Sequence, residues 1–210
     1  MKQLHNLSSL NFITHGFYDA RDSEKDPQPV FMNQVHSADA LFLTERPDTP
    51  PSVDALITRT PNLNLTVKTA DCAPILLADP TSRLIAAIHA GWKGAFQGII
   101  ENTVLQMLRL GANLDTLSAG IGPHIQKQSF EMKADVHSLF PKTEAVFFEL
   151  RSDKIFFDFD AYVIARLKRA GVKSIESVGD DTYPDHQYFS YRRDPKDPHR
   201  QYSSIMIQED

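Results

Sequence analysis

The chain has 210 residues, of which 41% are hydrophobic and 23% charged, a composition typical of folded globular proteins rather than disordered ones. Lys and Arg number 22 against 27 Asp and Glu, and the net charge of −5 argues against a nucleic-acid partner, which needs a broad basic surface. The single cysteine excludes a disulfide within the chain.

The first residues and the apolar runs bear on the cellular compartment. Residues 1–6 lack the apolar core of a signal peptide, and no apolar run approaches the roughly 20 residues that span a bilayer. We therefore expect a cytoplasmic protein without a membrane segment. The length predicts one well-cored domain over residues 1–210, and we expect a monomer.

Short apolar runs alternate with Pro, Asp, Ser and Asn over the first 90 residues, a pattern that predicts strands. The predicted strands are residues 12–17, 30–35, 40–43, 55–58, 63–67, 75–78 and 84–89. From Lys93 the apolar residues recur three or four apart until Gly111, which predicts an amphipathic helix with a glycine stop.

The second half of the chain mixes both element types. We predict strands over residues 117–121, 188–191 and 203–208, a hairpin of residues 145–150 and 154–159, and a short helix over 131–139. Asp160 is the expected cap of a helix over residues 161–170 that Gly171 ends. Strands separated by three helices predict a mixed α/β (α+β) fold, with helices packed outside a mixed sheet.

Three residues at the ends of predicted strands, His36, Cys72 and His89, have apolar or small neighbours. Two imidazoles and a thiolate can hold zinc and leave a fourth tetrahedral position open, which distinguishes a catalytic zinc from a structural one. Ordinary packing is the alternative, because buried cysteines and packed histidines are common. The spacing matches neither a zinc finger nor a His-Glu-x-x-His helix, so spacing alone does not decide.

Six sequence blocks, in order along nearly the whole chain, resemble the YfiH family, also called the laccase-domain or multicopper polyphenol oxidase family. The blocks are Asn33-Gln34-Val35-His36, Asp54-Ala55-Leu56-Ile57-Thr58, Thr69-Ala70-Asp71-Cys72-Ala73-Pro74, His89-Ala90-Gly91-Trp92-Lys93-Gly94, Ile121-Gly122-Pro123 and Phe189-Ser190-Tyr191-Arg192-Arg193-Asp194. Members of this family are described as zinc-dependent purine nucleoside phosphorylases.

The resemblance implies a layered α-β-β-α sandwich with mixed sheets, similar to cysteine-hydrolase-like domains. It places the family's metal ligands on His36, Cys72 and His89. It also implies purine nucleoside and phosphate as small-molecule substrates, with adenosine deaminase and methylthioadenosine phosphorylase activity in addition. Zinc in such a site brings the pKa of bound water towards neutrality, so that hydroxide can attack a carbon such as C6 of adenosine.

Two departures from the family pattern concern the site. His124 follows Gly122-Pro123 where the family usually has cysteine, and it could be an extra ligand, a proton carrier or a surface residue. The family's glycine-rich segment after the first strand is replaced by residues 18–22. We expect the altered loop of residues 18–28 to leave the substrate pocket more open or differently selective.

Other residues of these blocks are candidates for binding or proton transfer. Lys93 is our first choice for holding phosphate and Arg192 the second, because Arg offers a bidentate fork; for both, a solvated charge is the alternative. Asp71 could orient a ligand histidine, act as a base or simply form a turn. Trp92 could stack on a purine, with a core or gate role equally open.

Three rival functions remain open from the sequence. Eight scattered histidines are too few for a four-copper oxidase, but a single copper at His36, Cys72 and His89 is possible, because the same ligand set forms blue-copper sites. Without metal, Cys72 could be a nucleophile with His89 as its base, in a hydrolase that edits cell-wall (peptidoglycan) precursors. A binding protein without enzymatic activity is the third alternative.

Overall fold

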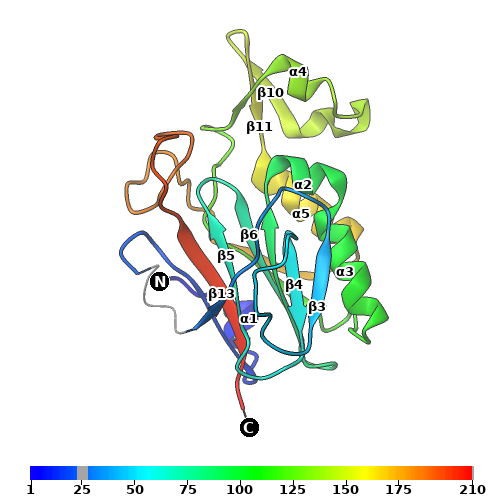
Figure 1. The fold of residues 1–210 in the computed structure, drawn as a ribbon. Helices are drawn as coiled ribbons and strands as arrows, with labels where there is room; N and C mark the ends of the chain where they lie inside the picture. Colours follow the sequence, from blue (N-terminus) through cyan, green and yellow to red (C-terminus); the bar gives the residue numbers. More distant parts are fainter. Residues whose placement is uncertain (23–27, 210) are drawn as a thin grey trace.

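Two stacked sheets form the centre of the molecule in the computed structural model, which describes residues 1–22 and 28–209 (Figure 1). The larger sheet has the strand order β12-β8-β6-β7-β4-β3. These strands are β12 (Ser174–Ser177), β8 (Ser118–Ile121), β6 (Ala73–Asp79), β7 (Leu84–Ala90), β4 (Ala55–Thr58) and β3 (Ala40–Leu43). The antiparallel hairpin of β6 and β7 occupies the middle, and the outer pairs β3 with β4 and β12 with β8 are parallel.

The smaller sheet has the strand order β1-β13-β5-β2. Its strands are β1 (Ile13–Phe17), β13 (Gln201–Ile207), β5 (Asn64–Thr69) and β2 (Pro29–Val30). β13 pairs antiparallel with both β1 and β5. Leu65 and Ile205 of this sheet belong to one buried apolar cluster with Leu76 and Ala87 of the larger sheet. Side chains from both sheets therefore fill the space between them.

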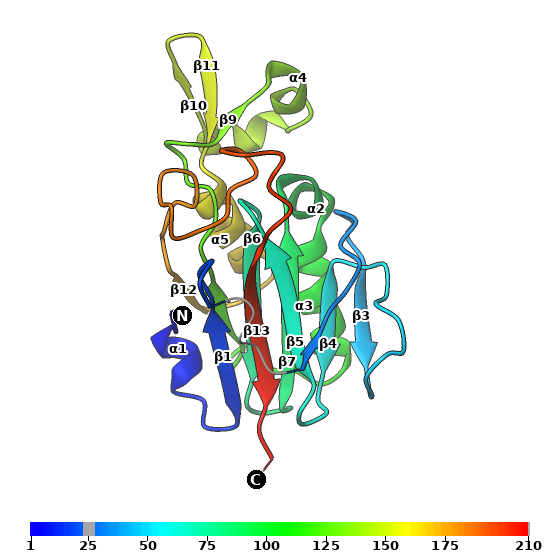
Figure 2. The same ribbon diagram turned by 60° about the vertical axis from the view of Figure 1, so that its left-hand side comes forward.

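Three helices cover the opposite face of the larger sheet (Figure 1), namely α2 (Trp92–Gln97), α3 (Ile99–Arg109) and α5 (Phe159–Arg169). Ile57, Ile75 and Ile88 point to this face, because successive side chains of a strand alternate. The larger sheet is thus covered on both faces, which explains why β6 and β7 are continuous apolar runs. A short helix α1 (His5–Ser8) packs beside β1 (Figure 2) and also contacts β8.

A small lobe stands at the top of both views (Figures 1 and 2). It contains the sheet β10-β11-β9 with β10 (Phe148–Arg151), β11 (Lys154–Phe157) and β9 (Glu131–Met132), the helix α4 (Ala134–His137) and the 3-10 helix η2 (Lys142–Phe147). Phe140 of the lobe contacts α2, with 4.8 Å between its ring centroid and that of Phe96 and 6.4 Å to that of Trp92. Aromatic contacts therefore hold the lobe against the helical layer.

The mixed α/β class is confirmed, and three details of the predicted helices need correction. The helix predicted from Lys93 is two helices, because Gly98 adopts a left-handed φ of 100° between α2 and α3. Asp158, not Asp160, caps α5, and its carboxylate accepts a hydrogen bond from the N–H of Ala161. The helix predicted over residues 131–139 is β9 followed by the short α4.

The observed strands differ from the predicted ones at three segments. The strand predicted over residues 188–191 is wrong, because this segment forms turns in which the Arg193 guanidinium donates hydrogen bonds to the carbonyls of Thr182 and Tyr188. The predicted strand over residues 30–35 ends at Val30, and β12 was not predicted. Within the altered loop of residues 18–28, residues 23–27 lie outside the described residues. Among the described helices, each is too short or too polar to cross a membrane.

Candidate metal centre

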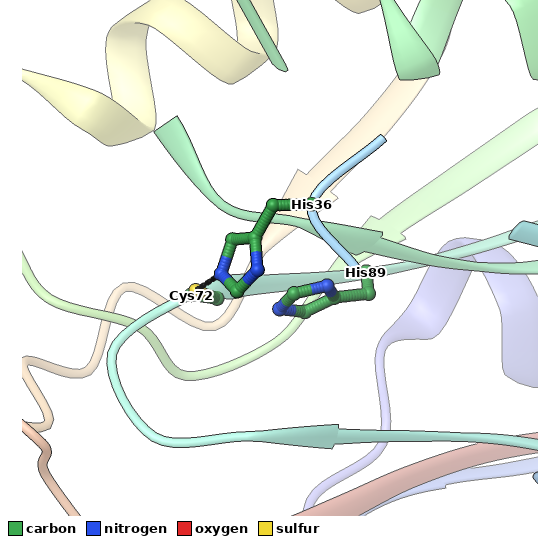
Figure 3. Close-up of side chains that lie close together, drawn as sticks. All are labelled: His36, Cys72 and His89. Carbon is green, nitrogen blue, oxygen red and sulfur yellow. Dashed lines mark hydrogen bonds between the residues drawn. The ribbon is translucent and has the colours of Figure 1, made fainter. Parts of the chain in front are cut away.

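Three segments that are distant in sequence bring His36, Cys72 and His89 together (Figure 3). His36 lies in the loop after β2, Cys72 in the turn between β5 and β6, and His89 in β7. Because the β6 and β7 hairpin pairs Pro74 with His89, Cys72 lies beside the same end of β7. The possible ligand atoms of the three lie within 4.8 Å of one another, and His36 Nε2 is 3.8 Å from Cys72 Sγ.

The backbone around this cluster is shaped for close approach. His36 has a φ of 60° and Asp71 a φ of 82°, conformations that are uncommon for residues other than glycine. A Cβ on Gly91 would lie 2.6 Å from Cδ2 of His36 and 3.2 Å from Sγ of Cys72. The absence of a side chain at Gly91 therefore makes room for two of the three candidate ligands.

Two polar side chains, to which the sequence alone gave no role, stabilise the loop that carries His36. The Gln34 amide donates to the carbonyl of Lys68 (2.7 Å) and accepts from its N–H (2.9 Å), which ties the loop to β5. Asp54 is fully buried, and its carboxylate accepts hydrogen bonds from the N–H groups of His36 (3.0 Å) and Ser37 (2.6 Å). Both residues occur in the sequence blocks quoted above, but only the fold reveals what they contact.

The pKa values of the cluster reflect its burial and its charges. Burial acts to raise the pKa of the Cys72 thiol, but the charge of His89 and hydrogen bonds from His36 and His89 outweigh it and lower the pKa to about 6. Burial acts to lower the pKa of His89, but the Cys72 charge and the Asp54 hydrogen bond raise it to about 9. Cys72 is therefore available as a thiolate, the form in which cysteine binds metals or attacks carbonyl carbons.

The buried carboxylate beside His89 is also perturbed. Burial acts to raise the pKa of Asp54, but the hydrogen bond from His89 and those from Ser37 lower it to about 2. Its Oδ1 lies 2.7 Å from Nδ1 of His89. The Nε2 atom of His89 is thus the nitrogen that remains free for a metal.

A cavity of about 760 Å³ opens beside the cluster and has all three residues in its wall. Its aromatic lining consists of Trp92, Phe130, Phe159 and Tyr191, and its basic lining of Lys68, Arg192 and Arg200. The volume lies within the roughly 300–1,000 Å³ typical of small-molecule pockets. One cavity therefore combines a possible metal site, flat apolar side chains and positive charge.

Two of the three residues proposed from the sequence for substrate contact are among the described residues that line the cavity, and the third is not. Trp92 and Arg192 line the cavity. Lys93 is exposed on α2 and is not among the described residues that line the cavity, whereas Lys68 and Arg200, which the sequence reasoning missed, do line it. From the sequence alone, Lys68 in β5 could not be distinguished from a lysine exposed to solvent, because the strand order determines that its side chain faces the cavity.

Asp71 lines the cavity, but both of its carboxylate oxygens have protein partners. One accepts a hydrogen bond from the Thr182 hydroxyl (2.7 Å) and the other from the N–H of Arg192 (2.6 Å). The Asp71 carboxylate therefore joins the turn that carries Cys72 to the segment that carries Arg192. Neither of these two partners is a candidate ligand histidine, and the role of Asp71 stays a prediction.

His124 is fully buried, so the surface-residue alternative is wrong. Its Nδ1 lies 2.9 Å from the carbonyl oxygen of Gly122 and its Nε2 lies 3.2 Å from Nε2 of Gln126. Burial lowers the pKa of His124. Among the described residues it belongs neither to the metal-binding group nor to the cavity lining, and its role as a proton carrier stays a prediction.

The family model for "multi-copper polyphenol oxidoreductase laccase" matches residues 18–208. The chain belongs to this family. Together with the His-Cys-His group, membership in a laccase-like family favours a metal-binding site without specifying the metal.

Curated relatives carry the name purine nucleoside phosphorylase. One from Rickettsia prowazekii is 34% identical over 192 residues, which cover 89% of this chain and 76% of that protein. The Escherichia coli protein YfiH is 35% identical over 172 residues, which cover 80% of this chain and 69% of that protein. The names of these family members support an enzyme that acts on small molecules.

Solved structures support the same family fold. A crystal structure of a protein from Neisseria meningitidis has a TM-score of 0.79 at 30% identity and covers 90% of this chain and 78% of its own. The Bacillus licheniformis protein YfiH also has a TM-score of 0.79, at 29% identity, and covers 86% of this chain and 74% of its own.

Proposed function

We propose that this protein is a zinc-dependent purine nucleoside phosphorylase. The observation that carries the proposal is the single cavity whose wall contains His36, Cys72 and His89 together with aromatic and basic side chains. The names of the relatives point to the same reaction. Adenosine deamination and methylthioadenosine phosphorolysis are included in the proposal as further reactions of the same cavity.

The donor set fits zinc. Tetrahedral zinc with histidine and cysteine ligands brings neighbouring donor atoms to about 3.4–3.8 Å from one another, and the donor atoms of the three residues lie within 4.8 Å. The Nδ1 atom of His89 already has Asp54 as its partner, so its Nε2 can face the ion. When bound, zinc would supply a Lewis acid at the cavity wall.

The walls of the cavity suit the two substrates of phosphorolysis. Trp92, Phe130 and Tyr191 offer flat surfaces for a purine ring. Arg192, Arg200 and Lys68 offer the positive charge that a phosphate ion requires. The Arg192 guanidinium carbon lies 5.6 Å from the centroid of the Phe130 ring, so the basic and aromatic walls meet there. This placement favours Arg192 over Lys93 for the phosphate role.

In the proposed reaction a phosphate oxygen attacks C1′ of the ribose, and the bond from C1′ to N9 breaks. The purine leaves with a proton and the sugar leaves as ribose 1-phosphate. The ribose is oxocarbenium-like in the transition state, and a positioned phosphate dianion stabilises that positive charge. Arg192 and Arg200 therefore act by orienting phosphate, and the aromatic wall acts by orienting the base.

Metal analysis followed by a product assay tests the proposal. The purified protein is expected to contain close to one zinc per chain and to convert adenosine and phosphate into adenine and ribose 1-phosphate. Inosine and ammonia as additional products would reveal deamination. A zinc-loaded protein that leaves purine nucleosides unchanged in the presence of phosphate would refute the proposed function.

A second candidate is a metal-free hydrolase with Cys72 as nucleophile, and the low pKa of its thiol favours it. Alkylation by iodoacetamide separates the two. A zinc-bound thiolate is protected until a chelator is added, whereas a free catalytic thiolate reacts at once. A third candidate, a single copper at the same residues, would give an intense absorption from thiolate to copper.

A further inference from the structure

We infer that Asp54 is a positioning residue that holds both histidine ligands of the proposed metal centre through one carboxylate. The inference rests on the metal site of the proposed function. Oδ1 of Asp54 lies 2.7 Å from Nδ1 of His89, and the two Asp54 oxygens accept hydrogen bonds from the N–H groups of His36 and Ser37. The carboxylate is fully buried, so solvent does not compete for these bonds.

The ring contact determines which nitrogen of His89 faces the metal. An ionised carboxylate can only accept a hydrogen bond, so the Nδ1 atom of His89 carries a proton, and Nε2 is the nitrogen that would present a lone pair to a metal after losing its own proton. The backbone supports this arrangement, because the N–H of His89 donates to the carbonyl of Asp54 at 2.8 Å. His89 is thus fixed to Asp54 by both its ring and its main chain.

The backbone contacts act on the other histidine. His36 has a φ of 60°, a left-handed backbone conformation that is uncommon for residues with a Cβ and that contacts with surrounding residues must stabilise. The N–H groups of residues 35–37 converge on the Asp54 carboxylate at 3.2, 3.0 and 2.6 Å. They fix the loop in this conformation, and the His36 ring lies 4.8 Å from the His89 ring as a result.

These two sets of contacts predict a specific effect of Asp54→Asn. An asparagine has the same shape, but its amide nitrogen cannot accept hydrogen bonds and would face backbone N–H donors. Either the His89 ring or the His36 loop then loses its partner. Loss of such a partner typically weakens metal binding 10–100-fold, and we expect zinc affinity to fall within that range.

The chain offers a matched control in Asp79, which is also fully buried. Its carboxylate accepts hydrogen bonds from the N–H groups of Ser82 (3.0 Å) and Asn113 (3.2 Å) and from the Thr116 hydroxyl. Asp79 ends β6, and Cys72 directly precedes the same strand, so Asp79 lies about 20 Å from the cluster. Asp79→Asn removes a buried carboxylate of the same kind without touching the proposed centre.

The experiment measures zinc dissociation constants of wild type, Asp54→Asn and Asp79→Asn by competition with a chromophoric chelator. Urea denaturation of the zinc-free proteins gives their stability. We expect both variants to lose stability, but only Asp54→Asn to bind zinc 10–100-fold more weakly and to need correspondingly more zinc to protect Cys72 from iodoacetamide. An Asp54→Asn affinity within twofold of wild type, or an equal loss in Asp79→Asn, would overturn the inference.

A second measurement needs no variant. In ¹⁵N-resolved NMR spectra of the wild-type protein, the Nδ1–H proton of His89 is expected to exchange slowly with solvent. Rapid exchange, or zinc bound at Nδ1, would overturn the inference even if Asp54→Asn failed to fold. Because neither measurement uses turnover, an inactive enzyme with slow Nδ1–H exchange would count against the phosphorylase proposal and in favour of the role of Asp54.

Discussion

Gly91→Ala should disrupt the proposed metal centre through a single methyl group. Gly91 has φ −75° and ψ 163°, which alanine adopts freely, so the backbone does not resist the change. The new Cβ would lie 2.6 Å from Cδ2 of His36, whereas ordinary contacts begin near 3.4 Å. The His36 ring must therefore move by about 0.8 Å, several times the tolerance of roughly 0.2 Å on a metal–ligand distance.

The expected magnitudes follow from this overlap. Overpacking of this kind costs about 1–3 kcal/mol, and the loss of glycine flexibility in the unfolded chain offsets about 0.4–1 kcal/mol of it. We expect Gly91→Ala to lower the free energy of unfolding by about 1–2 kcal/mol. The zinc dissociation constant should rise at least about tenfold, which corresponds to about 1.4 kcal/mol.

Urea denaturation and chelator competition measure the two effects. Gly16→Ala in β1 is the control, because the new Cβ would meet mainly the flexible end of the Met1 side chain and none of the three candidate ligands. It should leave zinc binding unchanged. If Gly91→Ala binds zinc within twofold of wild type, the close packing of Gly91 on His36 does not constrain the centre, and the reasoning is wrong.

Three other expectations concern single residues. Cys72→Ala should remove most bound zinc and leave the fold intact by circular dichroism, and one tight zinc in this variant would show that the ligand assignment is wrong. Arg192→Ala should raise the KM for phosphate in phosphorolysis far more than Lys93→Ala does, since Arg192 is among the described residues that line the cavity and Lys93 is not, and equal effects would contradict this placement. Burial lowers the pKa of His124 in the folded protein. Below about pH 6.5, His124 therefore binds a proton in the unfolded chain but not in the folded protein, and the free energy of unfolding decreases as the pH falls. Urea midpoints from pH 7.5 to 5.5 should decline less steeply in His124→Gln than in wild type, and parallel declines would mean that His124 does not contribute.

The central strands of the larger sheet, β6 and β7, were the most predictable part of the fold. β6 and β7 are continuous apolar runs because both of their faces are covered, and this signal is local. The segment over residues 188–191 is rich in aromatic side chains, which favour strands, but the Arg193 guanidinium donates a hydrogen bond to the carbonyl of Tyr188 and no strand forms. That contact depends on the tertiary structure, so periodicity alone could not predict it.

In the candidate site, too, some residues could be predicted from the sequence and others depend on tertiary contacts. The grouping of His36, Cys72 and His89 could be predicted, because metal chemistry restricts the residue types and the family blocks contain all three. Asp54 could not be assigned a role, because its partner His89 is 35 positions away and the contact requires β4 to pair with β7. Lys68 in the basic lining was missed for a similar reason, since the side on which it projects is set by the pairing of β5.

The position of β13 affects the order in which the site can assemble during synthesis. β13 is the last of the four strands of the smaller sheet along the chain, yet it lies between β1 and β5. The proposed ligands at residues 36, 72 and 89 leave the ribosome more than 100 residues before β13 does. All three proposed ligands have therefore been synthesised while β1 and β5 still lack their shared neighbour. Arg192 and Arg200 come just before β13, so the basic wall of the cavity is completed last, when that neighbour closes the sheet.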